Sequence, residues 1–144
     1  MWQFIKAMFF AGSFLLTPTP VNITSSWLEI HLKDSVEALN SGATLEIDVT
    51  SIVPPTKPGG HDVVERLART EESFPKGCVE ARLTTKDQRE VLLTNVSSST
   101  SSTQTFLLLS KPNGMPIDLQ FATLFIRASC PIMATQIYWR NSGM

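Results

Sequence analysis

Apolar and polar residues alternate, one position in two, along much of the chain after its first twenty residues. The alternation is clearest over residues 43–52, where Leu45, Ile47 and Val49 share one face and Thr, Glu and Asp fill the other. The segment 27–32 has the same period. A two-residue period is typical of a strand with one buried face, so both segments predict strands.

The second half of the chain predicts more strands of the same kind. Two of them flank the polar turn Lys86-Asp87-Gln88 and therefore predict a β-hairpin. Residues 117–129 are apolar on both faces, which predicts a strand inside the sheet. The predicted strands of this half cover residues 79–83, 90–96, 106–109, 117–129 and 134–140.

Between the two halves the pattern changes. Residues 54–60 hold three prolines and two glycines, which predicts an exposed loop. Residues 61–74 then place apolar residues at helical spacing, so this segment predicts either a helix or an irregular strand. Asp34 to Glu37, followed by Gly42, predicts a single helical turn or a plain connection.

These elements together predict an all-β fold with room for one short helix. Short strands with turn signals about every 8–12 residues favour an antiparallel β-sandwich of about seven strands, and a partly closed barrel is the alternative. A chain of 144 residues with 42% apolar residues forms a single domain of ordinary size. We assign this domain to residues 21–144.

Residues 1–20 have a composition of their own. A short start with one positive charge, Lys6, precedes the uncharged apolar run 7–16, and a Thr-Pro-Thr-Pro breaker follows. This order is typical of a signal peptide, or of an N-terminal membrane anchor attached through residues 1–16. A first buried helix or strand of a cytosolic domain is the other interpretation. We expect a secreted or periplasmic protein that is either released or membrane-anchored.

The cysteine content agrees with export. Cys78 and Cys130 are the only cysteines, and neither belongs to a Cys-x-x-Cys motif. An even number of cysteines in an exported chain predicts one disulfide bond between them. Two buried, unpaired thiols are the alternative. Two N-glycosylation sequons also occur, at Asn22 and Asn95.

Charge and motifs exclude several classes of function. Twelve Lys and Arg against 13 Asp and Glu give a net charge of −1, so the sequence offers no basic surface for nucleic acid. Neither His31 nor His61 has a Cys or a second His at metal-ligand spacing. A small hydrolase would use Glu46 and Asp48, which share one strand face, or His61. We therefore predict no catalytic residues, no metal site and no cofactor, and expect a protein that is not an enzyme.

A binding surface is the better expectation. Tyr138 and Trp139 must lie on opposite faces of the last predicted strand, and Arg140 follows them; an exposed aromatic residue beside an arginine is a common anchor in protein interfaces. His61 lies in the loop region and joins this predicted binding set. Trp139 or Trp27 would serve as a stacking platform if the ligand were a sugar.

The sequence therefore favours a secreted or envelope-anchored, non-enzymatic β-sandwich that binds another protein. Loops on a rigid sandwich commonly carry recognition, and an inhibitor or immunity-type protein is one form of this function. A carbohydrate- or lipid-binding module with an exposed Trp is the first alternative. A small hydrolase is the second.

Overall fold

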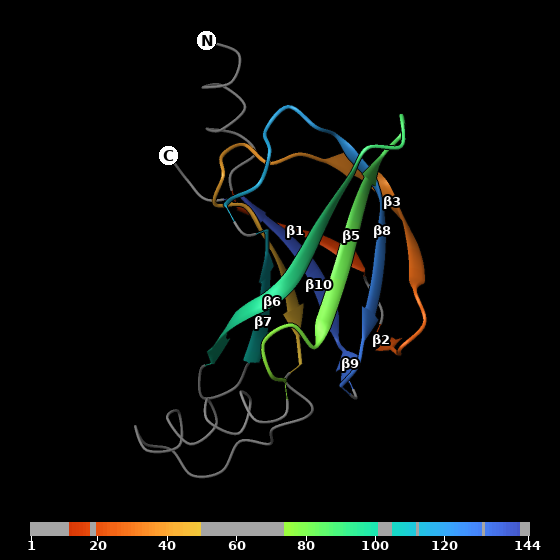
Figure 1. Ribbon diagram of the computed structural model, residues 1–144, viewed down its shortest axis with the longest axis vertical. Coiled ribbons are helices and arrows are strands. Elements are labelled where there is room, and N and C mark those ends of the chain that lie inside the picture. Colours follow the sequence, from red (N-terminus) through yellow and green to blue (C-terminus); the bar gives the residue numbers. More distant parts are fainter. Residues whose placement is uncertain are drawn as a thin grey trace.

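The fold is built from strands throughout its described part (Figure 1). The computed structural model describes residues 12–17, 20–49, 74–100, 105–111, 113–130 and 132–141. Its strands are β1 (Gly12–Thr17), β2 (Val21–Ile23), β3 (Leu28–Val36), β4 (Thr44–Asp48), β5 (Val79–Thr85), β6 (Glu90–Thr100), β7 (Thr105–Ser110), β8 (Phe121–Ala128), β9 (Ile132–Ala134) and β10 (Gln136–Asn141). The prediction of an all-β, antiparallel fold is confirmed. Among the described residues no helix is long and apolar enough to span a bilayer.

Eight of the strands form one curled sheet, in the order β1-β10-β4-β7-β6-β5-β8-β3, and β2 and β9 form a small second sheet. Every pairing in the large sheet is antiparallel. The two end strands, β1 and β3, line the same pocket, so the sheet curls almost into a closed barrel. Seven successive reversals of direction separate the two end strands, so β1 and β3 run antiparallel to each other.

The interior of the curled sheet is apolar, because alternate residues of each strand point inward. β5 shows this pattern without interruption: Val79, Ala81 and Leu83 are buried, and the residues between them are half-buried. At one side of the core the indole of Trp139 meets the ring of Phe121 edge-on, with centroids 6.2 Å apart. The largest fully buried side chains are Trp139, Phe121, Ile23, Leu45, Ile47, Leu83, Leu93, Leu107, Leu109, Leu124, Ile126 and Ile137.

The predicted hairpin is present as β5 and β6. Gln88 closes its turn with a φ of 70°, a conformation that few residues other than Gly, Asn and Asp adopt readily. Asp87 accepts hydrogen bonds from the hydroxyl of Thr85 and from Nε of Arg89. These two bonds hold the pKa of Asp87 below its usual value, with the Thr85 bond as the larger cause.

Three predicted elements differ from those observed. β3 continues to Val36, so the segment beginning at Asp34 is strand and not a helical turn. The strand expected from residue 117 begins at Phe121, because Asp118 has a φ of 68° and cannot continue a strand. The last predicted strand is divided between the two sheets at Thr135, whose amide and hydroxyl both donate to the carbonyl of Asp48.

The helix or irregular strand expected over residues 61–74 and the loop expected over 54–60 lie outside the described residues, apart from Phe74. Phe74 is buried at a bend that leads toward β5.

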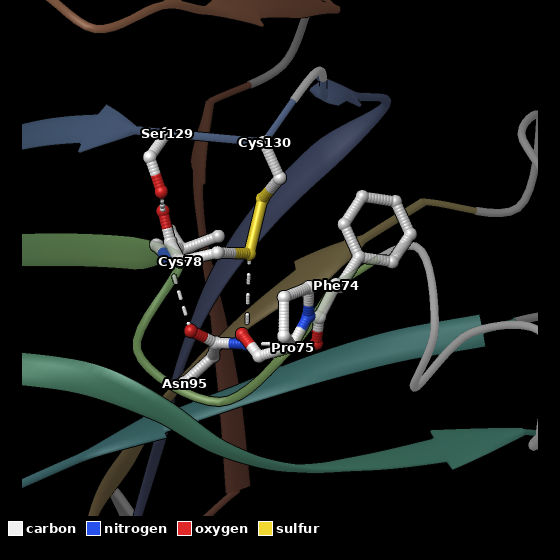
Figure 2. The surroundings of a disulfide bond; sticks show 7 residues. Phe74, Pro75, Cys78, Asn95, Ser129 and Cys130 are labelled. Carbon is white, nitrogen blue, oxygen red and sulfur yellow. Dashed lines mark hydrogen bonds between the residues drawn. A yellow bond between two sulfur atoms is a disulfide. The ribbon is translucent and has the colours of Figure 1, made fainter.

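The disulfide between Cys78 and Cys130 is confirmed (Figure 2). It joins the start of β5 to the end of β8, two neighbouring strands, with Cα atoms 5.7 Å apart. Asn95 of β6 lies beside it and is only 3% exposed. The Asn95 amide donates to the carbonyls of Phe74 and Pro75, and its oxygen accepts the Val79 amide at 2.9 Å.

Candidate functional site

A pocket of about 750 Å³ opens where the curled sheet fails to close. We call it the seam pocket. It is lined by residues 14–16, 32–37 and 39 and by Gln120, Trp139 and Asn141. The residues come mainly from the two end strands of the sheet and from β10, so the pocket exists only because the barrel is nearly complete.

One wall of the seam pocket is a network around the main chain that follows β3. The carbonyl of Glu37 accepts one hydrogen bond from Nε1 of Trp139 at 3.2 Å and another from Nδ2 of Asn141 at 3.0 Å. The Asn141 oxygen accepts the amide of Leu39 at 3.0 Å. These bonds tie the end of β10 to the segment that leaves β3, and they hold the indole in a fixed position.

The lining is apolar inside and polar at the rim. Phe14, Leu16 and Leu32 pack against the core, and Trp139 is completely buried behind them. Charged groups come from the β3 side, where Lys33 and Asp34 are exposed. A concave, mostly apolar surface with a few polar groups is the usual form of a binding site.

The two end strands that border the pocket differ in character. β1 has no charged residue along its six positions, whereas β3 carries Glu29, His31, Lys33 and Asp34. The β3 pairing with β8 is also interrupted between His31 and Val36, so four residues of β3 stand opposite one residue of β8. Charges and bulges are the means by which proteins protect a sheet edge against pairing. The β1 pairing with β10 also shifts register, between Leu15 and Thr17, so it is the absence of charged residues that leaves β1 with the less protected edge.

The structure brings one predicted binding residue to the seam pocket, Trp139. Tyr138 and Arg140 lie on the opposite face of β10, as expected from the alternation along a strand. The Tyr138 ring packs edge-on against Phe106, and Arg140 pairs with Glu46 at 3.3 Å. The remaining predicted binding residue, His61, lies outside the described residues.

A second aromatic surface lies on the outer face of β5 and β8. The Arg127 guanidinium carbon stands 4.2 Å from the centre of the Trp27 ring, and that of Arg82 stands 5.1 Å from it. Arg82 also lies 4.4 Å over Phe125. Since Trp139 is buried, a sugar-stacking role would fall to Trp27, and two arginines already stack on that ring.

Of the residues considered for hydrolysis, Glu46 and Asp48 lie on the same strand, β4, and His61 lies outside the described residues. Glu46 is bound by Arg140, and Asp48, on the same face of β4, is buried. His31 is exposed on β3, where it contacts Glu29. Within the described ranges no three potential metal ligands gather at one point.

The feature that sequence reasoning did not place in the sheet is β1. The apolar run of this segment resembles the core of a signal peptide, so the sequence predicts a leader here. The sequence pattern that favours a strand is the short alternation of Phe14 and Leu16 ahead of Thr17. It agrees with the alternative interpretation in which this segment forms a buried strand. Comparison of the chain with protein families, with characterised proteins and with solved structures finds no match.

Proposed function

We propose that the protein is a non-enzymatic binding protein of an oxidising, extracytoplasmic compartment, and that it binds an extended segment of another protein at the seam pocket. The observation that supports this most directly is the position of the pocket between the two end strands of the sheet. The outer edge of an end strand offers amides and carbonyls to an extended peptide, and a neighbouring apolar pocket offers selectivity for its side chains.

The disulfide supports the compartment. Cys78 and Cys130 are both buried and joined, and structural disulfides persist mainly in secreted, periplasmic or cell-surface proteins. A secreted protein and one held at the envelope by its N-terminal segment are both compatible with this bond.

The proposal is tested with a phage-displayed library of random peptides selected on the full, oxidised chain. Two matched variants place an added Trp in different positions. Ser35→Trp fills the mouth of the seam pocket, and Leu92→Trp changes an exposed residue of β6 that lies outside the pocket. We expect selected peptides to bind the wild type and Leu92→Trp equally, and Ser35→Trp at least about tenfold more weakly.

Two results would contradict the proposal. One is a selection without enriched peptides, or with peptides that bind both variants equally. The other is a fluorescent fatty acid that binds the wild type and does not bind Ser35→Trp, while no peptide binds. That result would make the seam pocket a lipid site.

A further inference from the structure

We propose that β1 is a replaceable strand: a partner protein binds by laying one of its own extended segments along β10 in the place that β1 occupies. This inference rests on the proposed function, because it specifies how the bound segment is held. It commits to a segment of a different protein as the occupant.

The first argument is that β1 belongs to the segment with leader character. Gly12–Thr17 falls inside residues 1–20, and its apolar residues are part of the run expected for a signal peptide or membrane anchor. Cleavage beyond this segment would remove β1 from the protein. Insertion of the segment into a bilayer would take β1 away from β10. As a cleaved signal peptide or as an inserted membrane anchor, the segment therefore leaves β10 without its neighbour.

The second argument concerns what such a removal exposes. β10 pairs with β1 over five register pairs, from Gly12 opposite Asn141 to Thr17 opposite Ile137. Without β1, this edge of β10 is free, and Phe14 and Leu16 no longer cover the core next to Trp139. A free edge with an apolar side is prone to pair with another strand. A partner's segment is the occupant that both satisfies the edge and restores the cover.

The third argument is the direction of the strands. A ninth strand inserted between β1 and β3 would run parallel to one of them and antiparallel to the other, because β1 and β3 are themselves antiparallel. A strand that replaces β1 keeps all pairings antiparallel. Parallel pairing is slightly less stable per residue, so the geometry favours replacement over insertion.

The fourth argument is that β1 shows which chemistry fits. Phe14 stands opposite Trp139, and Leu16 also packs against the core. The hydroxyl of buried Thr17 accepts the amide of Ile137 at 3.0 Å. The partner's segment should therefore be uncharged, carry an aromatic or large aliphatic residue at alternate positions, and end in Ser or Thr.

The interactions that keep β1 in the sheet are also limited. β1 pairs on one side only, its register with β10 shifts between Leu15 and Thr17, and the Leu15 side chain is 47% exposed. A strand at the end of a sheet, with one edge unpaired, opens at lower free energy than the strands inside the sheet. Exchange of β1 for another strand therefore does not require global unfolding.

The binding test uses the full chain with Phe14→Asp and Leu16→Asp, which weakens β1 in place. The probe is a biotinylated peptide with the sequence of residues 11–20, and the control peptide carries Asp at the same two positions. We expect the probe to bind the variant at least about tenfold more tightly than it binds the wild type, whose own β1 competes. The control peptide should bind neither protein. An oxidised, folded variant that does not bind the probe overturns the inference.

Hydrogen exchange of the wild-type chain tests the inference even where the variant fails to fold. We expect the amides that pair β1 with β10 to exchange well before those that pair β5 with β8. Simultaneous exchange of both sets would show that β1 leaves only on global unfolding and would overturn replacement. Dimers formed by exchange of β1 between two copies, detected by light scattering, would overturn the choice of a different protein.

Hydrogen exchange measured with bound library peptides separates this inference from the proposed function. Library peptides that bind at the seam pocket while the β1 amides stay protected would leave the proposed function standing and refute replacement. Library peptides that never bind would refute both.

Discussion

Removal of the Asn95 side chain should destabilise the fold by about 4 kcal/mol. In Asn95→Ala, three hydrogen bonds to the main chain, two buried and one partly buried, are lost, at a net contribution of about 1 kcal/mol each. The amide of Val79, which is fully buried, is then left without its acceptor, and this adds about 1 kcal/mol or more. The bonds join β6 to the segment that enters β5, so their loss also loosens the surroundings of the disulfide (Figure 2).

Asn95→Asp tests the direction of these bonds. An Asp oxygen can still accept from Val79, but the other oxygen would face the carbonyls of Phe74 and Pro75 where the amide now donates. Burial and these carbonyls would raise the pKa of the new carboxyl in the folded state above its unfolded value of about 3.9. The variant should therefore lose stability relative to the wild type as pH rises above that unfolded value, and recover as pH falls.

The assay is guanidinium unfolding of the oxidised proteins followed by circular dichroism. Asn22→Ala is the matched control, since Asn22 is exposed on β2 and its loss should change the free energy of unfolding by less than about 0.5 kcal/mol. A loss below about 1 kcal/mol for Asn95→Ala, or an Asn95→Asp variant whose deficit is independent of pH, would refute this reasoning.

Three further outcomes follow from the described contacts. Replacing both Cys78 and Cys130 by Ala should lower the free energy of unfolding by about 4 kcal/mol, because the bond closes a loop with a sequence separation of 52; a deficit under about 1 kcal/mol in denaturant unfolding would contradict the chain-entropy argument. The lowered pKa of Asp87 stabilises the fold at pH values above the ordinary pKa of 3.8, and this contribution is lost as the pH falls through the pKa of the folded state. Thr85→Val should move the pKa of Asp87, measured by NMR titration, toward 3.8. An unchanged pKa would exclude the Thr85 bond as the main cause. Trp139→Phe should cost about 2 kcal/mol, measured by thermal unfolding, through the lost indole bond and reduced packing; no change would show that the bond contributes nothing.

The local parts of the fold were predictable from the sequence. The β5–β6 hairpin follows from alternation on both sides of a polar turn, and β4 follows from the clearest two-residue period in the chain. The disulfide followed from an even number of cysteines together with a leader. Each of these inferences depends on residues near one another in sequence or on a property of the whole composition.

The seam pocket was not predictable in the same way. It requires β1 and β3 to meet after seven lateral strand contacts, and the sheet order is set by long-range packing that alternation does not encode. β1 also escaped detection because an apolar run of this length suits a signal peptide, an anchor and a strand alike. The positions of Tyr138 and Trp139 on opposite faces were predictable, but which face was buried depended on where β10 lies in the sheet.

The disulfide also divides the chain mechanically. Tension applied at Gly12 and Asn141 acts on two paired residues at adjacent ends of antiparallel strands, so it peels β1 from β10 one pair at a time, at low force. The stretch from Cys78 to Cys130 is closed by the disulfide and cannot lengthen. The contour length of the unfolded chain is therefore shorter by about 190 Å, at about 3.6 Å for each of 52 residues. Under tension the molecule would therefore behave as an inextensible ring that carries β5 to β8, with β1 as the first part to release.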